Sequence, residues 1–266
     1  MAKKFLLALV LLVLATGVVF SQTDFKGMAK NTITVDFGPT IYGAAIIGAA
    51  DDIAKNMLEG DLSLNSSGFG IAAQYERQLL KNFSVAGRFS YLGGGVGVSQ
   101  SNTETISGGG TAILTTDLGV KIISYSVEAH ARYYPWGKTF FLDGMLGYAN
   151  MTVDFSGKIV GTVDAYKEEF SVNMNASQGF LTVGAKLGWR ISFGKNGGFT
   201  FEPSLGYVYG IGFGDTVGDR LSKQINDKSE GAVDIKDNNF GQIFDILQNY
   251  VFIGGPRLSL AFGWRF

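Results

Sequence analysis

The chain has 266 residues, of which 46% are apolar and 17% are charged, and its formal net charge is −1. A disordered chain would need fewer apolar residues and more net charge, and a nucleic-acid-binding protein would need a basic surface, so both classes are excluded. The absence of cysteine excludes disulfides and thiolate metal sites. Because the chain has one histidine, we also expect no metal centre and no cofactor.

The first 21 residues have the three parts of a secretory signal peptide. Lys3 and Lys4 form a positive start, and an unbroken run of apolar or small residues follows over 5–20. This run is shorter than the roughly 20 residues that a spanning helix needs. We therefore expect cleavage after Ser21, which leaves residues 22–266 as one exported domain.

From about residue 30 onward, apolar and polar side chains alternate with the period of two that is typical of strands. A closed β-barrel is the only structure other than a helix that satisfies every backbone group in lipid. We therefore predict an all-β fold, an eight-stranded antiparallel up-and-down transmembrane β-barrel. The alternating stretches cover 32–41, 69–76, 83–91, 125–134, 140–149, 181–193, 199–211 and 252–266.

Short and long connections alternate strictly between these stretches. Three tight turns are rich in Pro, Gly and Asn, at 79–82, 135–138 and 194–197. Four long polar connections fall at about 48–63, 100–113, 157–175 and 214–248. Outer-membrane barrels have short periplasmic turns and long extracellular loops, so we expect these four loops outside the cell and both chain ends in the periplasm.

A soluble lipocalin-like barrel is the alternative, and it would carry its polar face outward. Here one face of each stretch is apolar or aromatic, and Tyr and Trp gather near the stretch ends as in the aromatic girdles of membrane barrels. This pattern favours the membrane barrel. Pro39, Pro203 and Pro256 fall within expected strands, where each removes a ladder hydrogen bond, so we expect bulges there.

The final residues alternate up to the last position, with Phe262, Trp264 and Phe266 on one face. This ending resembles the C-terminal aromatic signature that the barrel-assembly machinery reads in bacterial outer-membrane proteins. From residue 30 to 266 the plan is similar to the small eight-stranded outer-membrane barrels, which include the OmpA membrane domain, OmpX and OmpW. The resemblance implies an outer-membrane location, with outer-membrane lipid and the assembly machinery as partners.

If the apolar face meets lipid, a nearly balanced set of acids and bases points into the lumen. Eight strands leave an interior just wide enough for side chains to fill, so we expect a salt-bridge network that plugs the barrel. A charged constriction that selects small solutes is the alternative. The predicted lumen residues are Asp36, Glu76, Arg88, Glu128, His130, Arg132, Asp143, Lys186, Arg190, Glu202, Arg257 and Arg265.

We expect no enzymatic activity. A serine hydrolase needs a histidine to accept the serine proton, and His130 is flanked on its own face by Glu128 and Arg132. This setting is more typical of a histidine within an ion-pair network.

Two functions remain open from the sequence. The first is a closed barrel that presents its loops for structural or adhesive contacts, with a host molecule as candidate partner. The second is a narrow porin or OmpW-like carrier of small, hydrophobic solutes, suggested by a Gly-rich extracellular half and by apolar residues at helical spacing in 214–248.

Overall fold

The computed structural model describes residues 31–40, 62–105, 111–136, 139–163, 166–194, 198–216, 219–220, 223–224 and 255–266. The expected signal peptide at 1–21 lies outside these ranges, as do most of the expected loops at 48–63 and 214–248. Within the described residues, no helix is long and apolar enough to cross a membrane.

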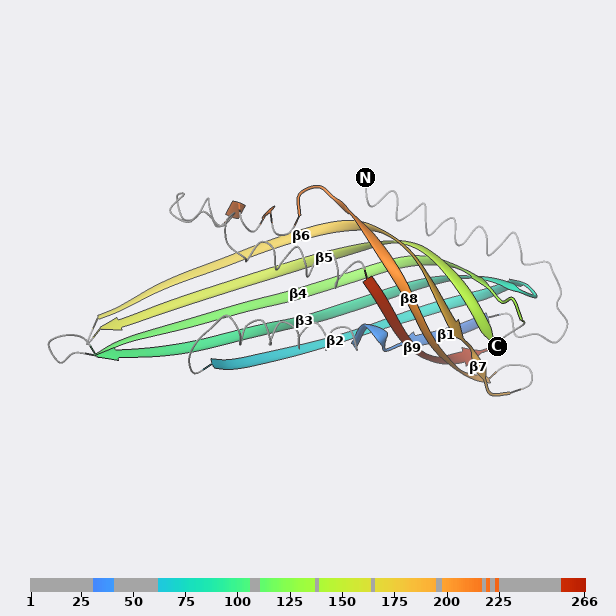
Figure 1. The fold of residues 1–266 in the computed structure, drawn as a ribbon, viewed down its shortest axis with the longest axis horizontal. Helices are drawn as coiled ribbons and strands as arrows, with labels where there is room; N and C mark the ends of the chain where they lie inside the picture. The colour runs from blue at the N-terminus through green and yellow to red at the C-terminus, as the bar shows by residue number, and fades with distance from the viewer. Residues whose placement is uncertain are drawn as a thin grey trace.

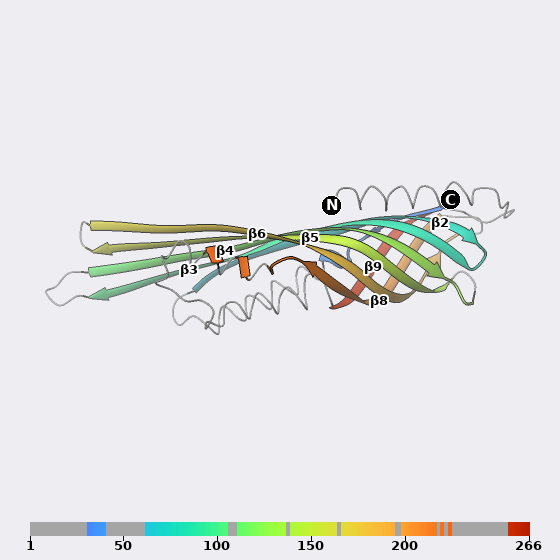
Figure 2. The same cartoon turned by 90° about the horizontal axis from the view of Figure 1, so that it is seen from above.

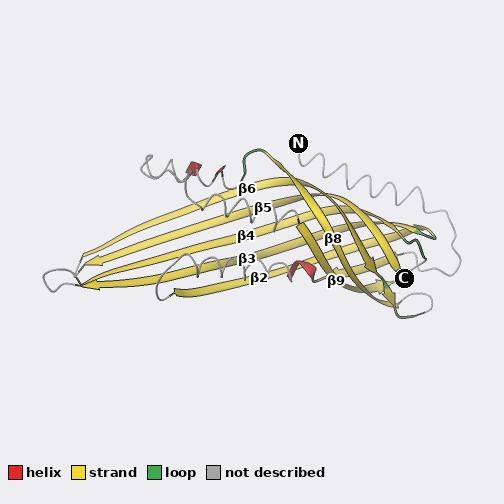
Figure 3. Cartoon of the chain, viewed as in Figure 1, coloured by secondary structure: helices red, strands yellow, loops and turns green. Residues whose placement is uncertain are grey.

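The described chain is almost entirely strand (Figure 3). All eight expected strands are present. The end of the stretch expected over 181–193 is separated from the rest as a short additional strand, which brings the number of strands to nine. The strands are β1 (Asn31–Asp36), β2 (Leu62–Leu80), β3 (Phe83–Thr105), β4 (Thr111–Tyr133), β5 (Phe140–Val163), β6 (Tyr166–Trp189), β7 (Ile191–Ser192), β8 (Gly198–Phe213) and β9 (Gly255–Arg265).

The sheet closes on itself. Neighbouring strands pair antiparallel in chain order from β1 to β6, β6 and β7 both pair with β8, and β8 pairs with β9. The ring is completed by β1, which pairs with β2 on one side and β9 on the other. Since β7 continues the line of β6 along β8, the fold is an eight-stranded antiparallel barrel, as predicted.

The barrel wall is much taller on one side than on the other. Strands β2 to β6 have 19 to 24 residues, whereas β1, β8 and β9 have 6, 16 and 11. Figures 1 and 2 show the long strands continuing past the closed ring as a five-stranded sheet. A tilted membrane strand needs about 9–11 residues, so about 8 to 15 residues of each long strand project beyond the bilayer.

This projecting sheet occupies much of two ranges that were expected to be loops. Strands β3 and β4 extend through most of 100–113, and β5 and β6 through most of 157–175. Above the bilayer both faces of a sheet can be wet, so the apolar–polar alternation fades although the backbone pairing continues. The first strand is shorter than expected, because it ends at Asp36 and a helical turn follows over 38–40.

The bulges expected at the three prolines are not found. Pro39 lies beyond the end of β1, and the β8–β9 register runs unbroken through Pro203 and Pro256. Gly188 pairs with Ser204 and Ile191 with Phe201, so Pro203 lies opposite the interruption between β6 and β7. The hydrogen bond that proline cannot donate is therefore lost at a position where the ladder is already broken.

The two faces of the wall differ as the alternation predicts. Large apolar side chains on the outer face are exposed, whereas the inner positions next to them are buried and polar. An apolar outer belt of this extent matches a surface that contacts lipid. Exposed aromatic residues on this face include Tyr75, Tyr91, Tyr133, Trp136, Trp189, Tyr207, Tyr209, Phe262, Trp264 and Phe266.

Candidate functional site: a charge network in the lumen

Asp143 illustrates how the strand register assembles the lumen network. Its register partners are Arg132 on β4 and Lys186 on β6, so the three side chains enter the barrel at one height. Arg132 Nε lies 2.7 Å from Asp143 Oδ2, and Lys186 Nζ lies 3.4 Å from the same oxygen. The carboxylate is thus flanked by two cations from opposite neighbouring strands.

A second group crosses the barrel at the end nearer the tight turns. Arg132 Nη1 lies 2.6 Å from Glu76 on β2 and 2.8 Å from Glu202 on β8. Arg190 contacts the same two carboxylates, each at 2.6 Å. Two guanidinium groups and two carboxylates therefore connect strands that lie on different sides of the lumen.

A third group lies farther from the tight turns, nearer the projecting sheet. Arg88 Nη2 contacts Asp36 Oδ2 at 2.6 Å, and Arg88 Nη1 lies 3.6 Å from Glu128. Glu128 also accepts a hydrogen bond from Arg257 Nη1 at 2.5 Å. The Arg257 side chain is 23% exposed, whereas the other ion-pair side chains of the network are at most 6% exposed. Arg257 therefore marks the wetter boundary of the network.

His130 connects the group around Asp143 with the group around Glu128. Its Nδ1 lies 3.0 Å from Asp143 Oδ1 and its Nε2 lies 3.3 Å from Glu128 Oε2. Both ring nitrogens therefore face carboxylates. Ser126 Oγ donates to Glu128 Oε1 at 3.1 Å, and none of the described serines forms a hydrogen bond with the histidine. This geometry differs from a serine–histidine catalytic pair.

The structure brings eleven of the twelve predicted lumen residues into one continuous network. Besides His130, it holds five carboxylates and five permanent cations, so their charges balance. The twelfth residue, Arg265, is buried at the end of the barrel near the tight turns, and its Nη2 donates to Gln78 Oε1 at 2.7 Å. The linked carboxylates are Asp36, Glu76, Glu128, Asp143 and Glu202, and the linked cations are Arg88, Arg132, Lys186, Arg190 and Arg257.

Two aromatic residues that the sequence analysis did not select lie against the arginines of the network. The Arg132 guanidinium lies over the Phe141 ring at 4.4 Å, and that of Arg190 over the Tyr134 ring at 5.4 Å. Tyr134 Oη donates to Glu76 Oε1 at 2.7 Å, and both aromatic side chains are buried. Alternation with Asp143 already assigns Phe141 to the inner face, so the pattern carried a signal for it.

The described residues around the network contain no group of three His, Asp or Glu side chains arranged to hold a metal ion. The burial of so many charges requires mutual pairing, because an uncompensated buried ion is very costly. The arrangement can therefore fill the lumen with fixed, neutralised charge.

Beyond the charge network, toward the projecting sheet, the inner wall is apolar instead of charged. An apolar cluster is buried there on β5 and β6, with partly buried side chains of β4 and β5 packed against it. Its buried members are Met151, Val153, Met174, Ala176 and Phe180. The inner surface therefore has a charged section near the tight turns and an apolar section toward the projecting sheet.

A closed antiparallel ring, an apolar outer belt and a charged interior together define a transmembrane β-barrel of the small eight-stranded outer-membrane type. No protein-family model matches the chain. No curated protein matches it either.

Solved structures with similar folds include Ail, the attachment invasion locus protein of Yersinia pestis. It has 12% identity and a TM-score of 0.40, and the match covers 90% of this chain and 99% of Ail. Ail in complex with the heparin analogue sucrose octasulfate gives 13% identity and a TM-score of 0.37, with the same coverage. The RagAB peptide importer gives 10% identity and a TM-score of 0.31, covering 56% of this chain and 18% of that one. These likenesses concern the fold alone.

Proposed function

We propose that this chain is an integral outer-membrane protein whose lumen is closed by the charge network and whose function is carried by the parts that project from the membrane. The observation that carries the proposal is the continuous network across the barrel from Asp36 on β1 to Glu202 on β8, made of ion pairs that the hydrogen-bonded ring of His130 connects. An eight-stranded interior is just wide enough for side chains to fill. Paired charges that span it leave no continuous path for a hydrated solute.

The projecting sheet of β2 to β6 is the surface on which this function rests. Past the closed ring, β2 continues for about ten residues and β6 for about thirteen, which at about 3.3 Å each corresponds to roughly 30–45 Å along the strands. A sheet of that length outside the membrane suits structural or adhesive contacts with a host molecule. The role is non-enzymatic.

The proposal includes export and insertion. The signal peptide is removed after Ser21, and the assembly machinery reads Phe262, Trp264 and Phe266. All three aromatic side chains are 40–58% exposed on the outer face beside β1, where a receptor can reach them before lipid does. Membrane fractionation followed by intact mass measurement tests this part, and the expected chain begins at Gln22.

Solute efflux from proteoliposomes tests whether the barrel is closed. Vesicles loaded with a small sugar and containing the refolded protein are expected to lose the sugar no faster than protein-free vesicles. Efflux that rises with the protein-to-lipid ratio would favour the constriction and contradict the plug.

The apolar inner cluster supports a second candidate, a carrier of small hydrophobic molecules. Met151, Val153 and Phe180 form a buried apolar section of the inner wall above the charges. An apolar fluorescent probe would bind to the wild type in detergent and bind more weakly to a Met151→Gln variant. Equal signals from both proteins and from empty micelles would remove this candidate.

A further inference from the structure

The outer face of the projecting sheet carries a hollow of about 990 Å³. Its floor is backbone, because β3 and β4 contribute Gly93, Gly95, Gly97 and Gly119 there. A Cβ atom added at Gly95 would lie 3.1 Å from the Val120 carbonyl oxygen, and one at Gly119 would lie 2.7 Å from Ser156 Oγ. The glycines thus keep the floor low, and side chains of the neighbouring strands form the walls.

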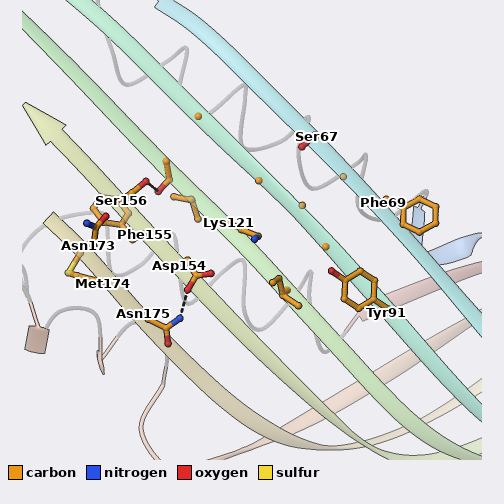
Figure 4. Close-up of a pocket in the computed structure, with 18 residues that line it drawn as sticks. Ser67, Phe69, Tyr91, Lys121, Asp154, Phe155, Ser156, Asn173, Met174 and Asn175 are labelled. Atoms are coloured by element: carbon orange, nitrogen blue, oxygen red, sulfur yellow. Dashed lines mark hydrogen bonds between the residues drawn. The ribbon is translucent and has the colours of Figure 1, made fainter. Parts of the chain in front are cut away.

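One wall is a row of polar side chains on three adjacent strands. Lys121 on β4 is the register partner of Asp154 on β5, which is the partner of Asn175 on β6. Asn175 Nδ2 donates to Asp154 Oδ1, as Figure 4 shows. Lys121 is exposed on the outer face, and among the described residues its side chain has neither an ion pair nor a hydrogen bond.

The opposite wall is aromatic. Phe69 is 53% exposed and Tyr91 is 38% exposed, and they lie on β2 and β3 beside the glycine floor. The Tyr91 ring extends along its own strand over Gly93, since a Cβ there would lie 2.8 Å from Tyr91 Oη. Its hydroxyl therefore points toward the hollow. Aromatic faces opposite amide, carboxylate and hydroxyl groups suit the alternating C–H and O–H surfaces of a sugar ring.

The position of the hollow relative to the membrane indicates which ligand it can bind. The outer face directly below it is apolar and aromatic, with Tyr91 and Tyr125 paired across β3 and β4. Tyrosines of membrane barrels sit at the headgroup level. The hollow begins at this row and opens on the lipid-facing side of the wall, so its occupant is the polar part of a lipid in the outer leaflet.

We propose that this hollow binds the phosphorylated saccharide headgroup of an outer-leaflet glycolipid. Lys121 binds the phosphate, Asp154 and Asn175 bind sugar hydroxyls, and Tyr91 and Phe69 pack against the sugar faces. The proposal uses the outer-membrane location given above, but it is independent of whether the lumen conducts.

The test is calorimetric titration of the detergent-solubilised, refolded protein with deacylated rough lipopolysaccharide, the water-soluble sugar phosphate part. Three proteins are compared: the wild type, a Lys121→Gln, Asp154→Asn, Asn175→Ala variant, and a Lys158→Gln, Glu169→Gln control. The control removes an exposed ion pair of 2.9 Å on the same sheet, whose side chains are both 45% exposed. A single Lys121→Gln variant repeats the test with one exposed side chain changed, and circular dichroism checks that each barrel is folded.

The expected result is saturable binding by the wild type and the control, with affinity lower by about tenfold or more in the triple variant, as the loss of charge-assisted hydrogen bonds implies. Inorganic phosphate alone is expected to compete only weakly. A wild type that does not bind, or a triple variant that binds equally well, would overturn the proposal. Full competition by inorganic phosphate would assign the hollow to a free anion and overturn the glycolipid assignment.

Discussion

Asp36 and Arg88 form a 2.6 Å ion pair at the point where β1 ends. The same carboxylate accepts hydrogen bonds from the backbone nitrogens of Gly38 and Leu260, at 2.8 and 3.0 Å, and from Ser259 Oγ at 2.6 Å. Asp36 thus terminates the strand that closes the barrel and also anchors one end of the charge network. The closure of the wall and the filling of the lumen depend on one side chain.

Asp36→Asn keeps the shape of the side chain and removes its charge. Loss of one partner from a buried ion pair costs about 3–5 kcal/mol, and we expect the lower end because Glu128 also lies 3.6 Å from Arg88. Urea unfolding in lipid vesicles, followed by tryptophan fluorescence, measures the change. Glu169→Gln is the matched control, since an exposed pair contributes about 0–1 kcal/mol. Equal losses in the two variants would contradict the assigned role of Asp36.

Arg190 and Glu202, 2.6 Å apart, are expected to be strongly coupled. Neutralising either one to Gln leaves the other as a buried, partly unpaired charge, whereas neutralising both removes that penalty. The double variant should therefore lose less stability than the sum of the single variants, with a coupling of about 1–3 kcal/mol. A double-mutant cycle of unfolding free energies gives this value, and additive losses would show that the pair acts independently.

The seam between β1 and β9 has no room for a side chain at Gly263. A Cβ there would lie 2.0 Å from the Ile33 carbonyl oxygen and 2.6 Å from Thr34 Cγ2. Gly263→Ala should destabilise the barrel by about 1–3 kcal/mol through overpacking. Gly144→Ala is the control, because a Cβ there meets nothing within 4 Å, and we expect it to change stability by less than about 0.5 kcal/mol. Both variants are measured by the same urea unfolding, and a larger loss in Gly144→Ala would contradict the seam geometry.

The outward orientation of Trp189 and Trp264, which are 48% and 58% exposed, predicts contact with lipid. Each test variant keeps one of these tryptophans and carries Phe at the other two tryptophan positions. Lipids brominated near the headgroup should quench its fluorescence more than lipids brominated deep in the acyl chain. Aqueous iodide should quench weakly. Strong iodide quenching without lipid quenching would place this face in water.

Much of the barrel and most of its lumen residues could be predicted because a thin wall with two different environments imposes a strict period of two. Glu128, His130 and Arg132 alternate with Val127, Ala129 and Ala131, and the structure buries the former on the inner face. The alternation determines which face a residue occupies. It does not determine partners, so the contacts of Arg132 with Glu76, on β2, and Glu202, on β8, depend on closure of the ring and were not predictable individually.

The projecting sheet was missed for the same reason. Residues such as Thr115, Asp117 and Ser156 lie in strand segments above the apolar belt, where the outer face is polar, so their pattern resembles that of a polar loop. The buried pair Tyr134 and Phe141 was not among the predicted lumen residues, because only charged side chains and His130 were selected from the inner face. Alternation places both aromatic residues on the inner face, but their contacts with Arg132 and Arg190 depend on the three-dimensional arrangement.

Single-channel recording of the refolded mature chain in a planar bilayer tests the closed lumen most directly. The wild type is compared with an Arg190→Ala, Arg257→Ala variant, which removes one cation from each end of the network. We expect a silent wild type and discrete conductance steps in the variant, since the loss of both guanidinium groups leaves unfilled space between charged walls. Steady conductance steps in the wild type would contradict the plug and make transport through the lumen the leading function.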